Sequence, residues 1–256
     1  MTAARMPPWS VTAAAGLDAL PVLARHVMID IGPAHRPLVA DALGDGLLPM
    51  HRRPDVVKRV RDTFLAKTIP GIVCAPKAPQ PDGWIWIGVS FPFREDGVRV
   101  RSAVTLPRAG IGGILTPWDV AGRIAAGTFP AAEELLSLAD LGRAHGVAVG
   151  LFGSAALQAL TGLSYMEPSS DVDAVVVART VAGLRSFHAA LAEFAKRHSR
   201  TYDVEVAVPS GLGVKLTELV SDVTAVVGRG IDGVRLVDRR RVLDEIDTLP
   251  PLGPVP

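Results

Sequence analysis

The sequence predicts a protein of the α+β (α/β) class, in which a mixed-sheet C-terminal domain follows a smaller α+β N-terminal domain. Two observations predict this fold. Helix and strand patterns alternate from residue 133 onward, and two alternating runs flank an Asp96-Gly97 turn in the first part of the chain. Such alternation is typical of a sheet covered by helices, and Asp-Gly between alternating runs is typical of a hairpin. The 256 residues suit two small domains, which we place at 1–112 and 113–256.

The N-terminal domain is expected to combine a helix with a hairpin. Val57, Val60 and Phe64 recur at helical spacing and could share one face. The runs on either side of Asp96-Gly97 have the alternation expected of strands. The residues after the hairpin are rich in glycine and include a proline, which favours a linker. We therefore expect a helix at 54–66, strands at 84–89 and 98–101, and a linker at 110–117.

The C-terminal domain shows a regular series of elements. Apolar residues from Val181 to Phe194 step by three and four, which is the period of an amphipathic helix. Val147–Phe152 is a continuous apolar run and Tyr202–Val208 alternates, as strands do. The expected elements are helices at 133–144, 155–160 and 181–194, and strands at 147–152, 171–177, 202–208 and 234–237.

Composition argues against several classes of function. The chain has 27 Lys+Arg and 26 Asp+Glu residues, so it lacks the basic excess of nucleic-acid-binding domains. Cys74 is the only cysteine, which fits a reducing compartment such as the cytoplasm. Ala144–Met166 is uncharged and long enough to span a bilayer, but its glycines and polar residues favour a buried strand and a short helix. We therefore expect a cytoplasmic protein that binds neither nucleic acid nor membrane.

The chemistry is predicted to centre on Gly153-Ser154, where a strand ends and a helix begins. Glycine lets the backbone approach a ligand closely. The free N–H groups at a helix start attract an anion such as phosphate. The Ser154 hydroxyl could bind the same phosphate or could simply cap the helix. We predict a phosphate-binding bend at these two residues.

A pair of carboxylates follows on the next predicted strand. Asp171 and Asp173 are two residues apart, so both side chains lie on one face. Two adjacent carboxylates repel each other unless a cation joins them, and Mg²⁺ prefers oxygen ligands. A third carboxylate is expected from Tyr202–Val208, with Glu205 as the first choice and Asp203 as the alternative. We predict that Asp171, Asp173 and Glu205 are catalytic and hold Mg²⁺ or Mn²⁺. Three carboxylates would allow two metal ions, which clamp the attacking and leaving oxygens of an in-line displacement.

These residues resemble a known superfamily. Gly153-Ser154 followed by Asp171-Val172-Asp173 is similar to the signature of polymerase-β-like nucleotidyltransferases, with a longer gap than most members have. The intervening residues are more specific. Phe152 to Tyr165, together with Ser169 to Asp173, resembles the phosphoribosyl-dephospho-CoA transferase family, also called malonate decarboxylase holo-[acyl-carrier protein] synthase. The similarity is dense over 152–177 and weaker in segments such as Arg25-His26.

The resemblance implies a nucleotidyltransferase-like fold for the C-terminal domain, a reaction and its partners. The donor would be triphosphoribosyl-dephospho-CoA, and the acceptor would be a serine of the acyl-carrier subunit of malonate decarboxylase. Attack of the hydroxyl on the α-phosphorus would release diphosphate. The implied roles are phosphate binding for Gly153 and Ser154 and metal binding for Asp171 and Asp173. Val204 stands where we expect the family to have glycine, which leaves open whether Asp203 or Glu205 faces the metal.

A triphosphate carries several negative charges, so cationic partners are expected. The candidates for binding the substrate phosphates are Arg52, Arg53, Arg99 and Arg101, with Lys215 as a further one. Arg99 and Arg101 share one face of the predicted hairpin, which could also be an ordinary solvated face. The N-terminal domain is expected to bind substrate or the carrier subunit.

Two other functions fit the same residues. The chain could be another nucleotidyltransferase that adenylylates a small molecule or a protein. It could also be a non-catalytic nucleotide-sensing protein on an inherited fold. Only the second of these would tolerate loss of Asp171 and Asp173, so their substitution separates the catalytic hypotheses from the non-catalytic one.

Overall fold

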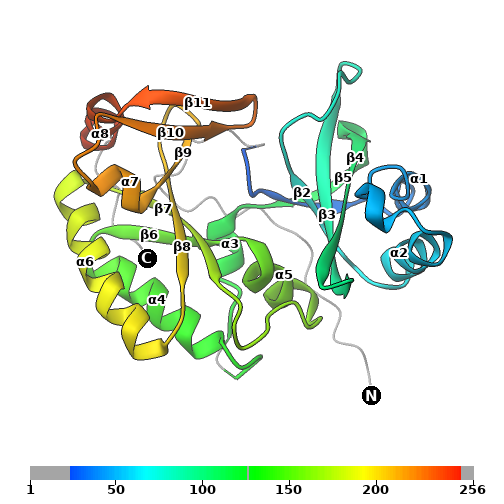
Figure 1. Cartoon of the computed structure of the whole chain (residues 1–256), viewed down its shortest axis with the longest axis horizontal. Helices are drawn as coiled ribbons and strands as arrows, with labels where there is room; N and C mark the ends of the chain where they lie inside the picture. Colours follow the sequence, from blue (N-terminus) through cyan, green and yellow to red (C-terminus); the bar gives the residue numbers. More distant parts are fainter. Residues whose placement is uncertain (1–23, 126, 249–256) are drawn as a thin grey trace.

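A computed structural model describes residues 24–125 and 127–248 of the chain. Two β-sheets lie side by side with helices packed against them (Figure 1). Residues up to Leu115 build the first sheet, and residues from Val147 onward build the second. The α+β class predicted from the sequence is confirmed by this combination of helices with antiparallel and mixed sheets.

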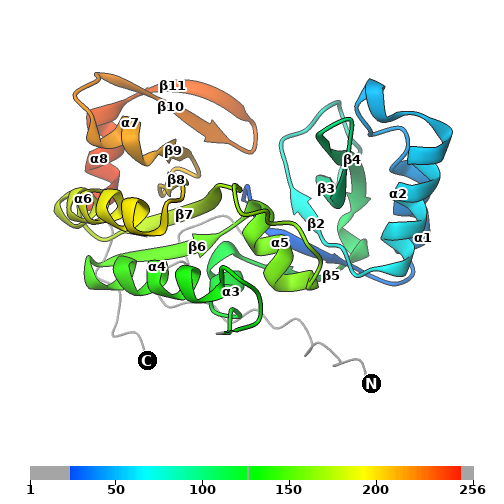
Figure 2. The ribbon, with the colours of Figure 1, turned by 60° about the horizontal axis from the view of Figure 1, so that its bottom comes forward.

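The N-terminal sheet has, among the described residues, five antiparallel strands in the order β4-β3-β2-β1-β5. Its elements are β1 (Met28–Ile31), α1 (Arg36–Ala42), η1 (Pro49–His51), α2 (Pro54–Ala66), β2 (Gly71–Val73), β3 (Trp84–Glu95), β4 (Val98–Pro107), η2 (Arg108–Gly110) and β5 (Ile111–Leu115). Helices α1 and α2 lie on the side of the sheet that faces away from the second sheet (Figure 2). Val60 and Phe64 of α2 share a buried core with Val100, Val104 and Leu106 of β4.

The C-terminal sheet is mixed. Among the described residues, six strands follow the order β11-β10-β9-β8-β7-β6, and only the β7–β8 pair is parallel. The elements are α3 (Pro117–Ala121), α4 (Ala132–Ala144), β6 (Val147–Leu151), α5 (Gly153–Thr161), β7 (Val172–Ala178), α6 (Val181–His198), β8 (Tyr202–Ala207), β9 (Gly213–Lys215), α7 (Leu216–Val220), β10 (Ala225–Gly230), β11 (Gly233–Asp238) and α8 (Arg239–Asp247). Parallel strands need a crossover connection, which α6 provides between β7 and β8.

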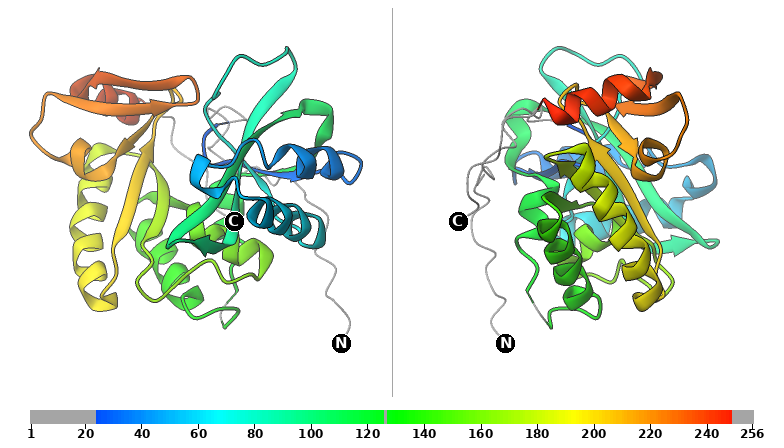
Figure 3. Two further views of the ribbon diagram at one scale, coloured as in Figure 1. Left: turned by 45° about the vertical axis from the view of Figure 1, so that its right-hand side comes forward. Right: turned by 90° about the vertical axis from the view of Figure 1, so that its left-hand side faces the viewer.

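The two faces of the C-terminal sheet differ. Helices α4 and α6 run side by side along one face (Figure 3), where Leu138 and Phe187 are fully buried in a core with Val149 and Val176. Val172, Ala174 and Val176 of β7 belong to this core. Side chains alternate along a strand, so Asp173, which lies between Val172 and Ala174, points to the other face. The polar residues of the predicted site therefore lie opposite these two helices.

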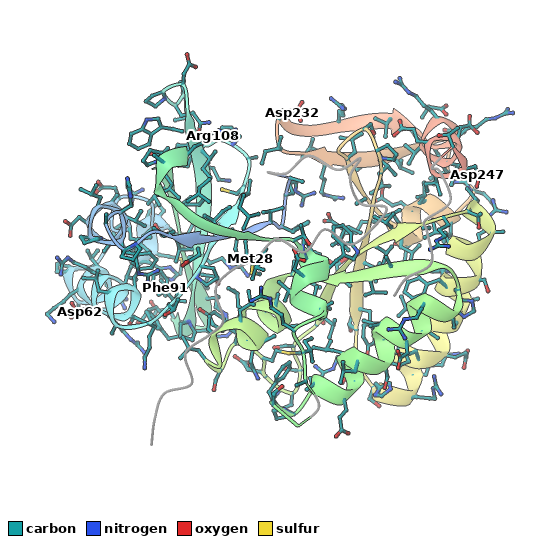
Figure 4. All side chains as sticks on the ribbon, turned by 180° about the vertical axis from the view of Figure 1, so that it is seen from behind. Met28, Asp62, Phe91, Arg108, Asp232 and Asp247 are labelled. Carbon is teal, nitrogen blue, oxygen red and sulfur yellow. The ribbon has the colours of Figure 1, made fainter. Side chains whose placement is uncertain are left out.

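The start of β1 joins the two halves. Val27 and Ile29 belong to the core of the N-terminal half, whereas Met28 belongs to the core of the C-terminal half. Figure 4 shows Met28 between the two halves, with Phe91 in one and Asp247 in the other. Successive residues of an extended chain point in opposite directions, which lets this short segment serve both cores.

The helix and the hairpin predicted for the N-terminal half are confirmed. Helix α2 spans the predicted residues 54–66, and β3 and β4 meet at Asp96-Gly97, where both residues have positive φ. Both strands extend well beyond the predicted ranges.

The prediction of a linker at 110–117 is wrong, because residues 111–115 form β5 and pair with β1. The glycines there serve close packing: a side chain on Gly112 would come 3.3 Å from the carboxylate of Asp30. The expected division between residues 112 and 113 falls inside this strand. We therefore propose a domain division after Leu115, at the end of the N-terminal sheet.

The C-terminal elements predicted from periodicity are all present as α4, α5, α6, β6, β7, β8 and β11, with ends shifted by a few residues. The sequence did not indicate α3, β9, β10, α7 or α8. Strand β9 and helix α7 are short, and β10 contains Gly228 and Gly230, which are unfavourable in strands.

The uncharged stretch Ala144–Met166 is divided among the end of α4, β6, α5 and the loop that follows. Among the described residues, no helix combines the length and apolar character that crossing a membrane requires.

Candidate active site

The predicted phosphate-binding bend lies where β6 meets α5. Gly153 is the first residue of α5 and has a φ of 64°, a conformation that favours glycine. A Cβ atom on Gly153 would overlap the carboxylate of Asp173. Phe152 caps the helix without a side-chain hydrogen bond, so the cap leaves the first N–H groups available. The bend therefore has the free amide donors that an anion site requires, and they lie directly beside Asp173.

Several charges gather around Asp173, which is half-buried on β7. Burial, together with the negative charges of Asp203 and Asp171, raises the pKa of Asp173 to about 6. The positive charges of Lys215 and Arg101 act in the opposite direction. Three carboxylates and two cations are thus close enough to influence one another, and a bound divalent cation would relieve the repulsion among the carboxylates.

Strand register bears on the choice of the third carboxylate. In the parallel pair β7–β8, Asp173 is the partner of Asp203, whereas Val175 is the partner of Glu205. Asp203 is therefore directly across from Asp173, and its side chain forms an ion pair with Lys215 of β9. This geometry favours Asp203, the alternative from the sequence, as the third member of the carboxylate cluster.

Glu205, the first choice from the sequence, binds two residues that precede β1. Its carboxylate accepts hydrogen bonds from Arg25 Nη1 and from His26 Nε2, both at 3.1 Å, and the residue is 5% exposed. Burial acts to raise the pKa of Glu205, but His26 and Arg25 outweigh it and lower that pKa to about 2. Arg25 is thus the counter-charge of Glu205 in this structure, and metal binding by Glu205 remains a prediction.

His26 also contacts the phosphate-binding bend. Its ring stacks on the ring of Phe152 with centroids 3.7 Å apart and planes at 23°. Burial lowers the pKa of His26, although Glu205 opposes the shift. Neither Arg25 nor His26 is among the site residues predicted from the sequence, and the weak family similarity at this segment was the one signal that pointed to it.

The structure separates the arginines that were predicted to bind substrate phosphates. Arg101 is exposed on β4 and close enough to Asp173 to lower its pKa. Arg99 is buried, and it donates to the main-chain carbonyls of Phe91 and Tyr165. Arg99 therefore ties β4 to the loop after α5 in this structure, and phosphate binding by Arg99 remains a prediction.

Arg52 and Arg53 precede α2 and are engaged within the N-terminal half. Arg52 donates to two main-chain carbonyls of the preceding loop, at 3.0 and 2.9 Å. Arg53 forms ion pairs with Glu95 and Asp96 at the β3–β4 turn, at 3.2 and 3.0 Å. Phosphate binding by either arginine remains a prediction.

The loop that carries Asp171 is held from both halves. Arg200 donates to the main-chain carbonyl of Ser170 at 2.7 Å. Arg94 on β3 forms an ion pair with Glu167 at 2.9 Å, across 73 residues of sequence. Such distant partners have no local signature in the sequence, so these contacts could not be predicted from it.

The donor set suits a divalent cation, but the site is not preformed. Carboxylate oxygens are the ligands that Mg²⁺ prefers. Among residues 24–125 and 127–248, however, no three His, Cys, Asp or Glu side chains are already arranged to hold a metal ion. Lys215 neutralises Asp203, so a cluster of three ligands requires Asp203 to turn away from Lys215. Metal binding by Asp171, Asp173 and Asp203 is therefore a proposal.

Three relatives named phosphoribosyl-dephospho-CoA transferase are similar to most of this chain. The protein of Xanthomonas euvesicatoria pv. vesicatoria is 28% identical over 189 residues, covering 73% of this chain and 86% of the relative. That of Xanthomonas campestris pv. campestris is 29% identical over 202 residues, covering 71% and 94%. That of Azotobacter vinelandii is 30% identical over 171 residues, covering 64% and 77%. No solved structure matches the chain.

A family model described as the phosphoribosyl-dephospho-CoA transferase MdcG C-terminal domain matches residues 119–240, which include Gly153, Asp173 and Asp203. Together, the relatives and this match make the chain a transferase. It belongs to the phosphoribosyl-dephospho-CoA transferase family.

Proposed function

We propose that this protein transfers the phosphoribosyl-dephospho-CoA group from triphosphoribosyl-dephospho-CoA to a serine hydroxyl of the acyl-carrier subunit of malonate decarboxylase. The observation that carries the proposal is the contact between Gly153 and the carboxylate of Asp173. Phosphoryl transfer depends on positioning and charge neutralisation, so a phosphate-binding bend and a carboxylate cluster must be neighbours. Family membership supports the identity of the transferred group.

In this proposal, the α-phosphate of the donor binds at the N-terminus of α5, beside Ser154. Asp171, Asp173 and Asp203 hold Mg²⁺ or Mn²⁺, which neutralises phosphate charge when bound. The serine oxygen of the carrier forms a bond to the α-phosphorus, and the bond from that phosphorus to the departing diphosphate breaks. The hydroxyl proton passes to a carboxylate of the cluster. The carrier supplies the nucleophile, so the chain itself needs none.

Arg101 and Lys215 are the cations that we assign to the diphosphate. Both act on the pKa of Asp173, so both are within electrostatic reach of the cluster. Lys215 would exchange its ion pair with Asp203 for one with phosphate, which would free Asp203 for the cation. Because Arg101 lies on β4, the N-terminal half would contribute directly to substrate binding.

The decisive experiment mixes the protein with apo carrier subunit, triphosphoribosyl-dephospho-CoA and Mg²⁺, and follows the mass of the carrier. We expect a mass gain equal to the phosphoribosyl-dephospho-CoA group, lost on adding a chelator or on Asp173→Asn. An unchanged carrier mass would contradict the proposal. Radiolabelled ATP in a parallel reaction tests the alternative, because an adenylylating nucleotidyltransferase would label its acceptor.

A further inference from the structure

We infer that Arg25 and His26, which lie outside residues 119–240, are positioning residues of the transfer site. Their contacts on both sides of β7 hold this strand, which carries Asp173, in place. This inference rests on the proposed function, because it concerns the same site. A positioning residue acts through other groups and does not touch the substrate itself.

His26 spans β7, the strand that carries Asp173. In the sheet order, β7 lies between β6 and β8. His26 stacks on Phe152, the residue that follows β6, and binds Glu205 of β8 at 3.1 Å. One side chain thus contacts the elements on both sides of the central strand.

Each contact of His26 leads directly to a carboxylate of the cluster. The main-chain N–H of Phe152 donates to the carbonyl of Asp173 at 3.2 Å, and Gly153 lies against the Asp173 carboxylate. On the other side, Glu205 is two residues from Asp203 on the same face of β8. A shift of His26 would therefore be transmitted to both Asp173 and Asp203.

Arg25 adds a contact to β10. Its guanidinium donates to Glu205 Oε2 at 3.1 Å and to the main-chain carbonyl of Arg229 at 3.2 Å. Gly213 of β9 makes room for this contact, since a side chain there would come 2.6 Å from Glu205 Oε2 and 3.3 Å from Arg25 Nη1. The pair thus reaches from β6 to β10 across the polar face of the sheet.

The backbone at His26 is in an unfavourable conformation. Its φ of 69° is uncommon for a residue with a side chain, and its side chain is 14% exposed. Strained residues persist where the surrounding contacts determine their position, and they concentrate at functional sites. In this conformation the imidazole of His26 lies against the ring of Phe152.

The test compares three substitutions of His26 in the full chain. His26→Ala removes both contacts, His26→Phe keeps a ring against Phe152, and His26→Gln keeps a donor for Glu205. We expect His26→Ala to lower kcat about 10–100-fold, as loss of a supporting contact does. The KM for the donor should stay within about threefold, because the substrate contacts remain. The two partial variants should each recover part of kcat.

The matched control is His198→Ala. His198 also lies against a phenylalanine ring, that of Phe194 at 4.3 Å, but on α6. Its loss should leave kcat unchanged. Hydrogen exchange provides a second measurement that does not need turnover: His26→Ala should accelerate exchange in segments 150–157 and 203–207, and His198→Ala should not.

Each outcome decides the inference. Parental kcat in His26→Ala, or a rise in KM with kcat unchanged, overturns it. If His26→Ala does not fold, the kcat of His26→Phe and His26→Gln decides by the same criteria. If the parental chain shows no turnover, the proposed function fails. The exchange pattern then decides the inference alone, and unchanged exchange in both segments overturns it.

Discussion

Asp173 on β7 and Asp203 on β8 are direct partners in the parallel strand pair, and the charge of Asp203 contributes to the raised pKa of Asp173. Without a bound cation, this arrangement is electrostatically unfavourable. Active sites commonly contain such groups, because the arrangement that binds the ligand is not the one that best stabilises the fold.

Asp173→Asn is expected to lower activity and raise stability. The transfer rate should fall by about 10²–10³-fold, as for loss of a group that stabilises transition-state charge. Without metal at pH 7, the free energy of unfolding should rise by about 1 kcal/mol. The substitution removes a partly buried negative charge that Asp203 and Asp171 repel. Carrier mass spectrometry and urea unfolding with a chelator measure the two effects. Asp140→Asn on α4 is the control, since its exposed pair with Arg143 should matter little.

Gly153→Ala and Gly162→Ala should differ in activity. Both glycines have positive φ, at 64° and 68°, so the backbone conformation alone should cost each variant about 1–2 kcal/mol of stability. A side chain at Gly162 meets no atom within 4 Å, whereas one at Gly153 overlaps Asp173. Only Gly153→Ala should therefore abolish transfer at a temperature where both variants are folded. Equal activity of the two variants would argue against a close approach at Gly153.

Glu205 should stabilise the fold in a pH-dependent way. Its pKa in the folded chain is about 2, below its ordinary value of 4.5, so its contribution is complete above about pH 5 and is lost as pH falls through 4.5 toward 2. Glu205→Gln should cost about 2–3 kcal/mol near pH 7 and progressively less between about pH 5 and pH 3. Urea unfolding of both proteins across this range gives the difference. A difference that does not change with pH would contradict the ion pair with Arg25.

Arg101→Gln should weaken donor binding more than Arg53→Gln does. Arg101 is exposed and within electrostatic reach of Asp173, whereas Arg53 is paired with Glu95 and Asp96. Loss of a charge-assisted contact to phosphate should raise the KM for the donor about tenfold or more. Steady-state kinetics with varied donor measures this effect. A larger effect from Arg53→Gln would indicate that the triphosphate binds near the start of α2 and not near Arg101.

The family-specific part of the site could be predicted because its signals are local. Gly153 and Ser154 are adjacent, and Asp171 and Asp173 are separated by one residue, so strand and helix geometry relates each pair without knowledge of the rest of the fold. Arg99 shows the limit of the same reasoning. It lies on β4 with Arg101, but the loop around Tyr165 that contacts it is 66 residues away in the sequence and leaves no mark in the local pattern.

The sequence by itself determined the α+β class, the three longest helices, the strands β6, β7 and β8, and the bend with its two aspartates, because periodicity and adjacent residues encode them. Only the tertiary structure decided that Asp203 is the partner of Asp173 and that Glu205 binds Arg25 and His26. The first depends on the register between two strands, and the second joins residues 179 and 180 positions apart. Neither relationship exists until the chain has folded and brought these groups within hydrogen-bonding distance.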